Sequence, residues 1–147
     1  MLRSHHLGEL QEAFVGKTVT LCGWVERLRE VGGVNFLVLR DRYAKLQLNL
    51  ESKLLTDLKL GREDCIKVIG ILGLRPDKDC KNEVNGSLEL TVKEIEVLNK
   101  SLTPPFVVDD KEDVNEDLRL RYRYLDLRRD YMKRNMEFRH KVVEQIR

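Results

Sequence analysis

Strict alternation in the segment 45–50, KLQLNL, is the feature that most limits the fold of this 147-residue chain. Side chains of a β-strand point alternately to its two faces, so the three leucines share one face and the polar residues the other. The segment 34–40 alternates in the same way, with Leu37 and Leu39 on one face. Two such strands in succession predict a hairpin with one face on a core and the other in solvent.

The outer face of this predicted hairpin carries an aromatic ring, Phe36, with Gln47 and Asn49 on the neighbouring strand. Arg29 and Arg40 lie close by in the sequence. A ring can stack on a base, an amide can bond to the edge of a base, and a cation can contact phosphate. This combination indicates a surface for single-stranded nucleic acid. A lone exposed ring is also common on ordinary protein surfaces, which is the competing interpretation.

Alternation and turn signals predict five strands, over residues 18–29, 34–40, 45–50, 65–74 and 88–98. A short helix is expected over 51–60, between the third and fourth strands. Gly23 lies inside the long first strand, where a glycine usually marks a bulge or a sharp bend. This order predicts an all-β fold with short helices, a five-stranded Greek-key OB-fold barrel. Another small β-barrel or meander is the alternative.

The barrel is expected to span residues 1–103, because Pro104 and Pro105 cannot continue a strand ladder. Residues 104–129 are predicted to form a linker and helical hinge. Residues 130–147 read as the first helix of a further, truncated domain. Apolar residues recur near one face of that helix and have no partner in the sequence given: Met132, Met136, Val143 and Ile146.

The charge of the chain is unevenly distributed. Residues 1–108 hold 16 Lys and Arg against 15 Asp and Glu, so nucleic-acid recognition there must depend on individually placed groups. Residues 109–117 contain six acids, and the run 118–129 contains five arginines and two tyrosines. That run could bind phosphate or bases, dock one domain on another, or form a hinge whose arginines pair with nearby acids such as those at 109–117.

Several functional classes find no support in the sequence. The longest apolar stretch, 68–74, is too short to span a bilayer, which takes about 20 residues. Three cysteines without a Cys-x-x-Cys motif indicate a reducing compartment, cytoplasmic or the matrix of an organelle. No phosphate-binding loop, nucleophile elbow or metal-ligand spacing occurs, so we expect neither catalysis nor a metal site in this segment.

Residues 18–25, 32–36 and 39–42, together with Gln47, resemble the anticodon-binding domain of bacterial-type aspartyl-tRNA synthetases. Residues 120–129 resemble the hinge that follows this domain in the same class II family. Lysyl- and asparaginyl-tRNA synthetases carry a related domain whose corresponding segments match less well. The two matches occur in the family's order and frame nearly the whole chain.

The resemblance implies roles for five barrel residues. Phe36 matches the residue that stacks on the central anticodon base, and Gln47 matches the one that bonds to its edge. Arg29 matches a position near the anticodon. Arg75 and Glu89, assigned to strands four and five, match positions that discriminate the flanking bases.

The loop 76–85 departs from the family pattern, so only Asn82 or Asn85 is expected to add a contact. Asn49 stands where an aromatic residue is common in the family. The hinge residues implied in tRNA or interdomain contacts are Arg121, Tyr122, Arg123, Arg128 and Arg129.

The resemblance further implies a parent aspartate–tRNA ligase, a homodimer that uses ATP and Mg²⁺ in a catalytic domain absent from this segment. Its partner would be the anticodon stem-loop of tRNA(Asp). Two other functions stay open at this point: a stand-alone module that binds single strands of any sequence, and a purely structural domain that docks through its arginine-rich run.

Overall fold

The structure is a computed structural model that describes residues 2–32, 34–55, 58–76, 78, 80 and 82–147. The chain divides into two compact units, Met1–Thr103 and Pro104–Arg147. None of the described helices combines the length and apolar character needed to cross a lipid bilayer.

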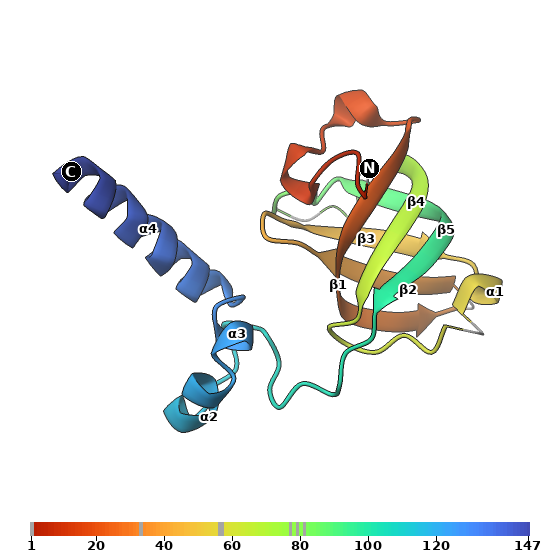
Figure 1. The fold of residues 1–147 in the computed structure, drawn as a ribbon. Helices are drawn as coiled ribbons and strands as arrows, with labels where there is room; N and C mark the ends of the chain where they lie inside the picture. The colour runs from red at the N-terminus through yellow and green to blue at the C-terminus, as the bar shows by residue number, and fades with distance from the viewer. Residues whose placement is uncertain (1, 33, 56–57, 77, 79, 81) are drawn as a thin grey trace. The chain divides into compact units, whose positions relative to one another are not determined.

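The first unit is a closed five-stranded barrel (Figure 1). Its strands are β1 (Thr18–Val31), β2 (Val34–Arg40), β3 (Lys45–Leu50), β4 (Cys65–Leu74) and β5 (Leu88–Asn99). They follow the order β1-β2-β3-β5-β4, and β4 pairs back with β1. Only the β3–β5 pair is parallel among the described strands. The predicted five-stranded barrel is therefore confirmed.

The bounds of three elements differ from those predicted. β1 continues two residues further, to Val31, and β5 one residue further, to Asn99. The helix expected over 51–60 is α1, Ser52–Leu55; residues 56 and 57 lie outside the described residues. Lys59 has a φ of 40°, which no right-handed helix allows, so the expected helix is too long at its C-terminal end.

The strand alternation fills the barrel interior. Leu37, Leu48 and Leu90 have no solvent exposure, and each comes from a different strand. Leu7 belongs to a 3₁₀ turn, Leu7–Glu9, which precedes the second 3₁₀ turn, Glu12–Phe14. Leu7 and Leu10 join the same core, so the N-terminal segment contributes to the barrel interior. Burying such a side chain stabilises the fold by about 1.5–3 kcal/mol.

Gly23 lies where β1 changes partner. Residues Thr18–Trp24 pair with β4, and residues from Trp24 onward pair with β2. A Cβ atom on Gly23 would lie 2.6 Å from the carbonyl oxygen of Arg40, so only glycine allows this close approach. The predicted bend in the first strand therefore coincides with the corner of the barrel.

Asp64 joins the segment before β4 to the end of β5. Its carboxylate accepts hydrogen bonds from the Gly61 N–H (2.9 Å), the Ser101 N–H (2.7 Å) and the Lys100 ammonium (3.1 Å). Desolvation raises the pKa of Asp64, but these three donors together outweigh it, so the pKa lies below its ordinary value. The Asp64 carboxylate therefore connects the residue before β4 to the residues that follow β5.

The second unit contains α2 (Glu116–Arg121), α3 (Arg123–Asp126) and α4 (Asp130–Ile146). The side chain of Asn115 caps α2 by accepting from the Asp117 N–H at 2.8 Å. Three apolar side chains form its buried cluster: Phe106, Val108 and Leu125.

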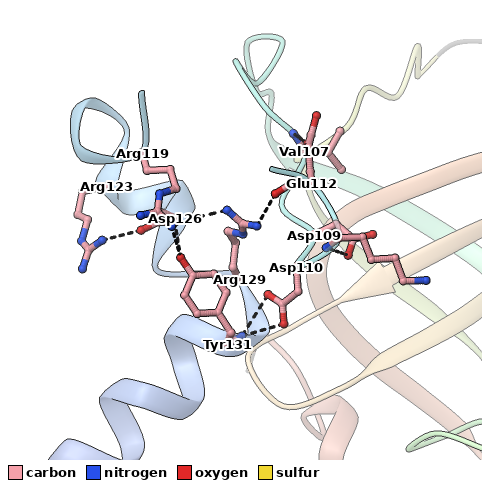
Figure 2. A network of polar contacts seen from close by, with 10 residues as sticks. Val107, Asp109, Asp110, Glu112, Arg119, Arg123, Asp126, Arg129 and Tyr131 are labelled. Atoms are coloured by element: carbon pink, nitrogen blue, oxygen red, sulfur yellow. Dashed lines mark hydrogen bonds and ion pairs between the residues drawn. The ribbon is translucent and has the colours of Figure 1, made fainter. Parts of the chain in front are cut away.

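Asp126 is the centre of a polar network in this unit (Figure 2). Its carboxylate has no solvent exposure and lies 2.5 Å from Nη1 of Arg123 and 3.9 Å from Nη1 of Arg129. Arg129 also donates to the carbonyl oxygen of Glu112 at 2.7 Å. The hinge interpretation expected the arginines to pair with nearby acids such as those at 109–117, and Arg123 and Arg129 pair with Asp126, an acid inside the run itself.

Candidate nucleic-acid interface

Pairing between strands sets four outward residues in a row across the barrel wall. Arg29 on β1 pairs with Phe36 on β2, and Phe36 pairs with Asn49 on β3. Asn49 pairs in turn with Thr91 on β5. The ring of Phe36 therefore has a cation on one side and an amide on the other.

A second row lies beside the first. Val38 on β2 pairs with Gln47 on β3, Gln47 with Glu89 on β5, and Glu89 with Gly73 on β4. Phe36 and Gln47 are thus diagonal neighbours on adjacent strands, a separation of about 7–8 Å that long side chains can bridge. Gly73 has no side chain, so no side chain on β4 lies directly opposite Glu89.

Burial confirms that these positions face outward. Phe36 is partly exposed and lies between buried Asn35 and buried Leu37. Gln47 is partly exposed between two fully enclosed leucines, and Glu89 alternates with buried residues in the same way. The structure therefore brings Phe36, Gln47 and Glu89 together on one face, as the alternation predicts.

Arg75 follows the last residue of β4, one position beyond the strand to which the resemblance assigned it. Its N–H donates to the Ser87 carbonyl at 2.9 Å, which extends the pairing of the strand ends. Its side chain is 9 % exposed, and Nη2 donates to Oε1 of Gln47. Nη1 lies 3.4 Å from the carbonyl oxygen of Gly86, and Nε has no partner in the described residues. No pattern in the sequence indicates the contact between Arg75 and Gln47.

A family model described as an OB-fold nucleic acid binding domain, of the tRNA anti-codon type, matches residues 19–98. This range contains all five strands of the barrel except the first residue of β1 and the last of β5. The chain belongs to this OB-fold family.

Curated relatives of this OB-fold chain include two bacterial aspartate–tRNA ligases. The protein of Bacteroides thetaiotaomicron is 43% identical over 152 residues, and that of Thermosipho melanesiensis is 46% identical over 150 residues. Both alignments cover 100% of this chain and 26% of the relative. The chain thus spans about a quarter of the length of these relatives.

A solved structure of asparaginyl-tRNA synthetase from Pyrococcus horikoshii is also similar. It superimposes with a TM-score of 0.69 at 26% identity, over 87% of this chain and 30% of that one. The similarity therefore extends beyond the barrel into the second unit.

Arg40 does not serve the outer face of the OB-fold barrel as a cation. It is buried, and its guanidinium pairs with Glu63 and lies 3.6 Å from Glu26. The bulge of β1 falls between Val25 and Arg27, at Glu26. The sequence interpretation that counted Arg40 among the phosphate-binding cations is therefore wrong, because two carboxylates already neutralise it.

Asn85 has a structural task in this OB-fold domain. Its φ is 62°, a backbone conformation that asparagine tolerates better than most residues. Its Nδ2 donates to the carbonyl oxygens of Leu7 (2.8 Å) and Lys45 (3.3 Å). Asn82 is exposed in the same loop. Of the two asparagines suggested for a nucleic-acid contact, Asn82 is therefore the one whose side chain lies at the surface.

Asn49 lies on the outer face, although the family resemblance implies no contact for it. It lies between Phe36 and Thr91 on the outer face, and its Oδ1 is buried without a partner in the described part of the chain. The alternation of the segment 45–50 predicts this outward position.

The predicted hinge residues differ in the contacts that they make. Arg123 and Arg129 are held by Asp126, whereas Arg121 is exposed and lies 5.9 Å from the centre of the Tyr122 ring. Arg128, the fifth predicted hinge residue, is half-buried.

Within the described residues, no three His, Cys, Asp or Glu side chains come together in a group able to hold a metal ion. The chemistry that the described face offers is stacking, hydrogen bonding and charge. These are means of recognition.

Proposed function

We propose that the barrel recognises the anticodon of tRNA(Asp) as the N-terminal part of an aspartate–tRNA ligase. The observation that carries this proposal is the placing of Phe36, Gln47 and Glu89 on adjacent strands of one outward face. The family match and the bacterial aspartate–tRNA ligases that the whole chain resembles support it.

Each group has a distinct part in this recognition. Phe36 stacks on the central base, a contact that contributes about 1–3 kcal/mol. Gln47 bonds to the edge of the same base, where a good paired contact discriminates by about 1–3 kcal/mol. Glu89 accepts from an exocyclic amino group of a flanking base and repels phosphate. Arg29 supplies the cation beside the stacked base.

Near-neutrality of residues 1–108 favours a discriminating site over a sequence-tolerant one. A tolerant single-strand binder depends on many cations that contact phosphate, and its affinity falls steeply with salt. Residues 1–108 contain 16 basic residues and 15 acidic residues. Affinity therefore depends on a few placed groups, and base identity decides it.

The parent protein would activate aspartate with ATP and Mg²⁺ and attach it to tRNA, as a homodimer in the cytoplasm. The chain spans 26% of the length of its curated relatives, and its sequence contains no phosphate-binding loop and no nucleophile elbow. We expect the 147-residue chain to bind RNA and to leave catalysis to the remaining part of the parent.

The direct test is Phe36→Ala, assayed by fluorescence anisotropy with an RNA stem-loop that bears the anticodon GUC. We expect at least about tenfold weaker binding at fixed salt, because one stacking contact is lost. Phe138→Ala is the matched control, since Phe138 is 70 % exposed on α4 of the second unit. Equal affinities for wild type and Phe36→Ala would refute the proposed face.

A panel of anticodons separates this proposal from its alternatives. Tighter binding to GUU than to GUC would assign the domain to an asparaginyl-tRNA synthetase. Similar binding to every anticodon, with a steep dependence on salt, would identify a stand-alone single-strand binder.

A further inference from the structure

The contact between Arg75 and Gln47 joins two residues on opposite sides of β5. Gln47 is on β3, Arg75 follows β4, and β5 lies between these strands in the barrel. Arg75 is 9 % exposed, so this contact is largely shielded from solvent. The following inference rests on the proposed anticodon function.

The chemistry of the two groups determines which way round the carboxamide lies. A guanidinium has hydrogen-bond donors and no acceptor, so it can bond only to the oxygen of an amide. Nη2 of Arg75 donates to Oε1 of Gln47. The Nε2 amino group of Gln47 is therefore kept away from Arg75, and a rotation of the amide by about 180° would bring two donor groups together.

The orientation of this amide matters because uracil and cytosine present opposite patterns. Uracil offers an acceptor at O4 beside a donor at N3, whereas cytosine offers a donor at N4 beside an acceptor at N3. An amide fits uracil in one orientation and cytosine in the flipped one, since it carries one donor group and one acceptor. A residue that forbids the flip selects between the two pyrimidines.

We propose that Arg75 is a positioning residue that locks the carboxamide of Gln47 in the orientation that accepts uracil and rejects cytosine at the central anticodon base. Its effect on the central base passes through Gln47. This role differs from the contact with a flanking base that the family resemblance implies for the same position.

The first experiment measures binding of stem-loops with GUC and GCC anticodons to the 147-residue chain and to Arg75→Met. Methionine keeps much of the apolar length of arginine and cannot hold the amide oxygen. We expect wild type to prefer GUC by at least about tenfold, and Arg75→Met to prefer it by less than about threefold.

Arg27→Met is the matched control. Arg27 is exposed and pairs with Val38, so it lies in the same row as Gln47, two strands away. Its loss removes one positive charge from the same face. It should weaken binding to both stem-loops by similar factors and leave the GUC-to-GCC ratio unchanged.

A double-mutant cycle isolates the flip itself. Gln47→Glu places two equivalent oxygens before the base, so this variant should prefer GCC, because a carboxylate accepts from the amino group of cytosine. A carboxylate has nothing to flip. Adding Arg75→Met to Gln47→Glu should therefore leave the ratio unchanged, whereas the same change in the wild-type background lowers it.

Arg75→Lys keeps one donor near Gln47 and should retain most of the preference for GUC. If thermal melting shows that Arg75→Met does not fold, Arg75→Lys takes its place in the comparison. A folded Arg75 variant that lacks a donor but keeps the wild-type ratio would overturn the proposal. So would a loss of selectivity confined to the third anticodon base, or a loss of the preference in folded Arg75→Lys. If wild type itself does not prefer GUC over unrelated anticodons, the proposed function fails instead.

Discussion

The barrel encloses sixteen buried apolar side chains in one cluster of the described residues, whereas the second unit encloses three. The barrel is stabilised mainly by non-directional burial, so its outer face can carry a polar recognition site without loss of the fold. The second unit depends far more on directional contacts around Asp126. We therefore expect the loss of one polar side chain to destabilise the second unit, and the barrel to respond chiefly to changes of its interior.

The largest expected effect comes from an interior change in the barrel. Leu48→Ala should lower the free energy of unfolding by about 3–5 kcal/mol, because Leu48 has no exposure and its loss leaves a cavity. Urea unfolding monitored by the single tryptophan, Trp24, measures this. Leu102→Ala is the control, since Leu102 is 91 % exposed. Equal losses in both variants would contradict the view that burial holds the barrel.

A smaller effect is expected from the polar centre of the second unit. Asp126→Asn should destabilise that unit by about 2–3 kcal/mol, because the buried guanidinium of Arg129 loses its charged acceptor. Hydrogen exchange should then rise over residues 104–147 and stay unchanged over the barrel. Asp113→Asn is the control, because Asp113 is exposed. Faster exchange in the barrel strands would show that the two units are not energetically independent.

The smallest of the three effects concerns a polar contact in the barrel. Asp64→Asn should cost about 1–2 kcal/mol at neutral pH, since two N–H donors and Lys100 lose a carboxylate acceptor. The pKa of Asp64 is lowered in the fold, so this contribution is complete above the ordinary carboxyl pKa of about 4. It is lost as the pH falls through the depressed value. Unfolding of wild type and variant should therefore converge in acid; a constant difference between them would contradict the assigned role.

Much of the barrel could be predicted from the sequence because alternation is a local property. KLQLNL and the segment 34–40 specify the faces of β2 and β3 without knowledge of their partners, and both strands have their predicted bounds. Local patterns are weaker at element ends. The sequence alone does not indicate the positive φ of Lys59, which precedes Leu60, a residue packed against the core.

The site could likewise be predicted only in part. The outward phase of Phe36, Gln47 and Glu89 follows from alternation, whereas the contact of Arg75 with Gln47 depends on the order in which strands close the barrel. The ion pairs of Arg40 likewise involve residues outside its own strand, Glu26 and Glu63. In the second unit a signal was present: Arg123 and Asp126 stand three residues apart, a spacing that brings opposite charges together on one turn of α3.

The position of Leu7 in the core has a practical consequence for work with this domain. Leu7 is fully enclosed, its N–H donates to Asp41 at 2.7 Å, and its carbonyl oxygen is held by Asn85. Cloning boundaries chosen from the first strand alone would remove Leu7 and expose the neighbouring part of the barrel core to water. Expression tags and dyes are better attached at the C-terminus, where α4 ends in exposed Ile146.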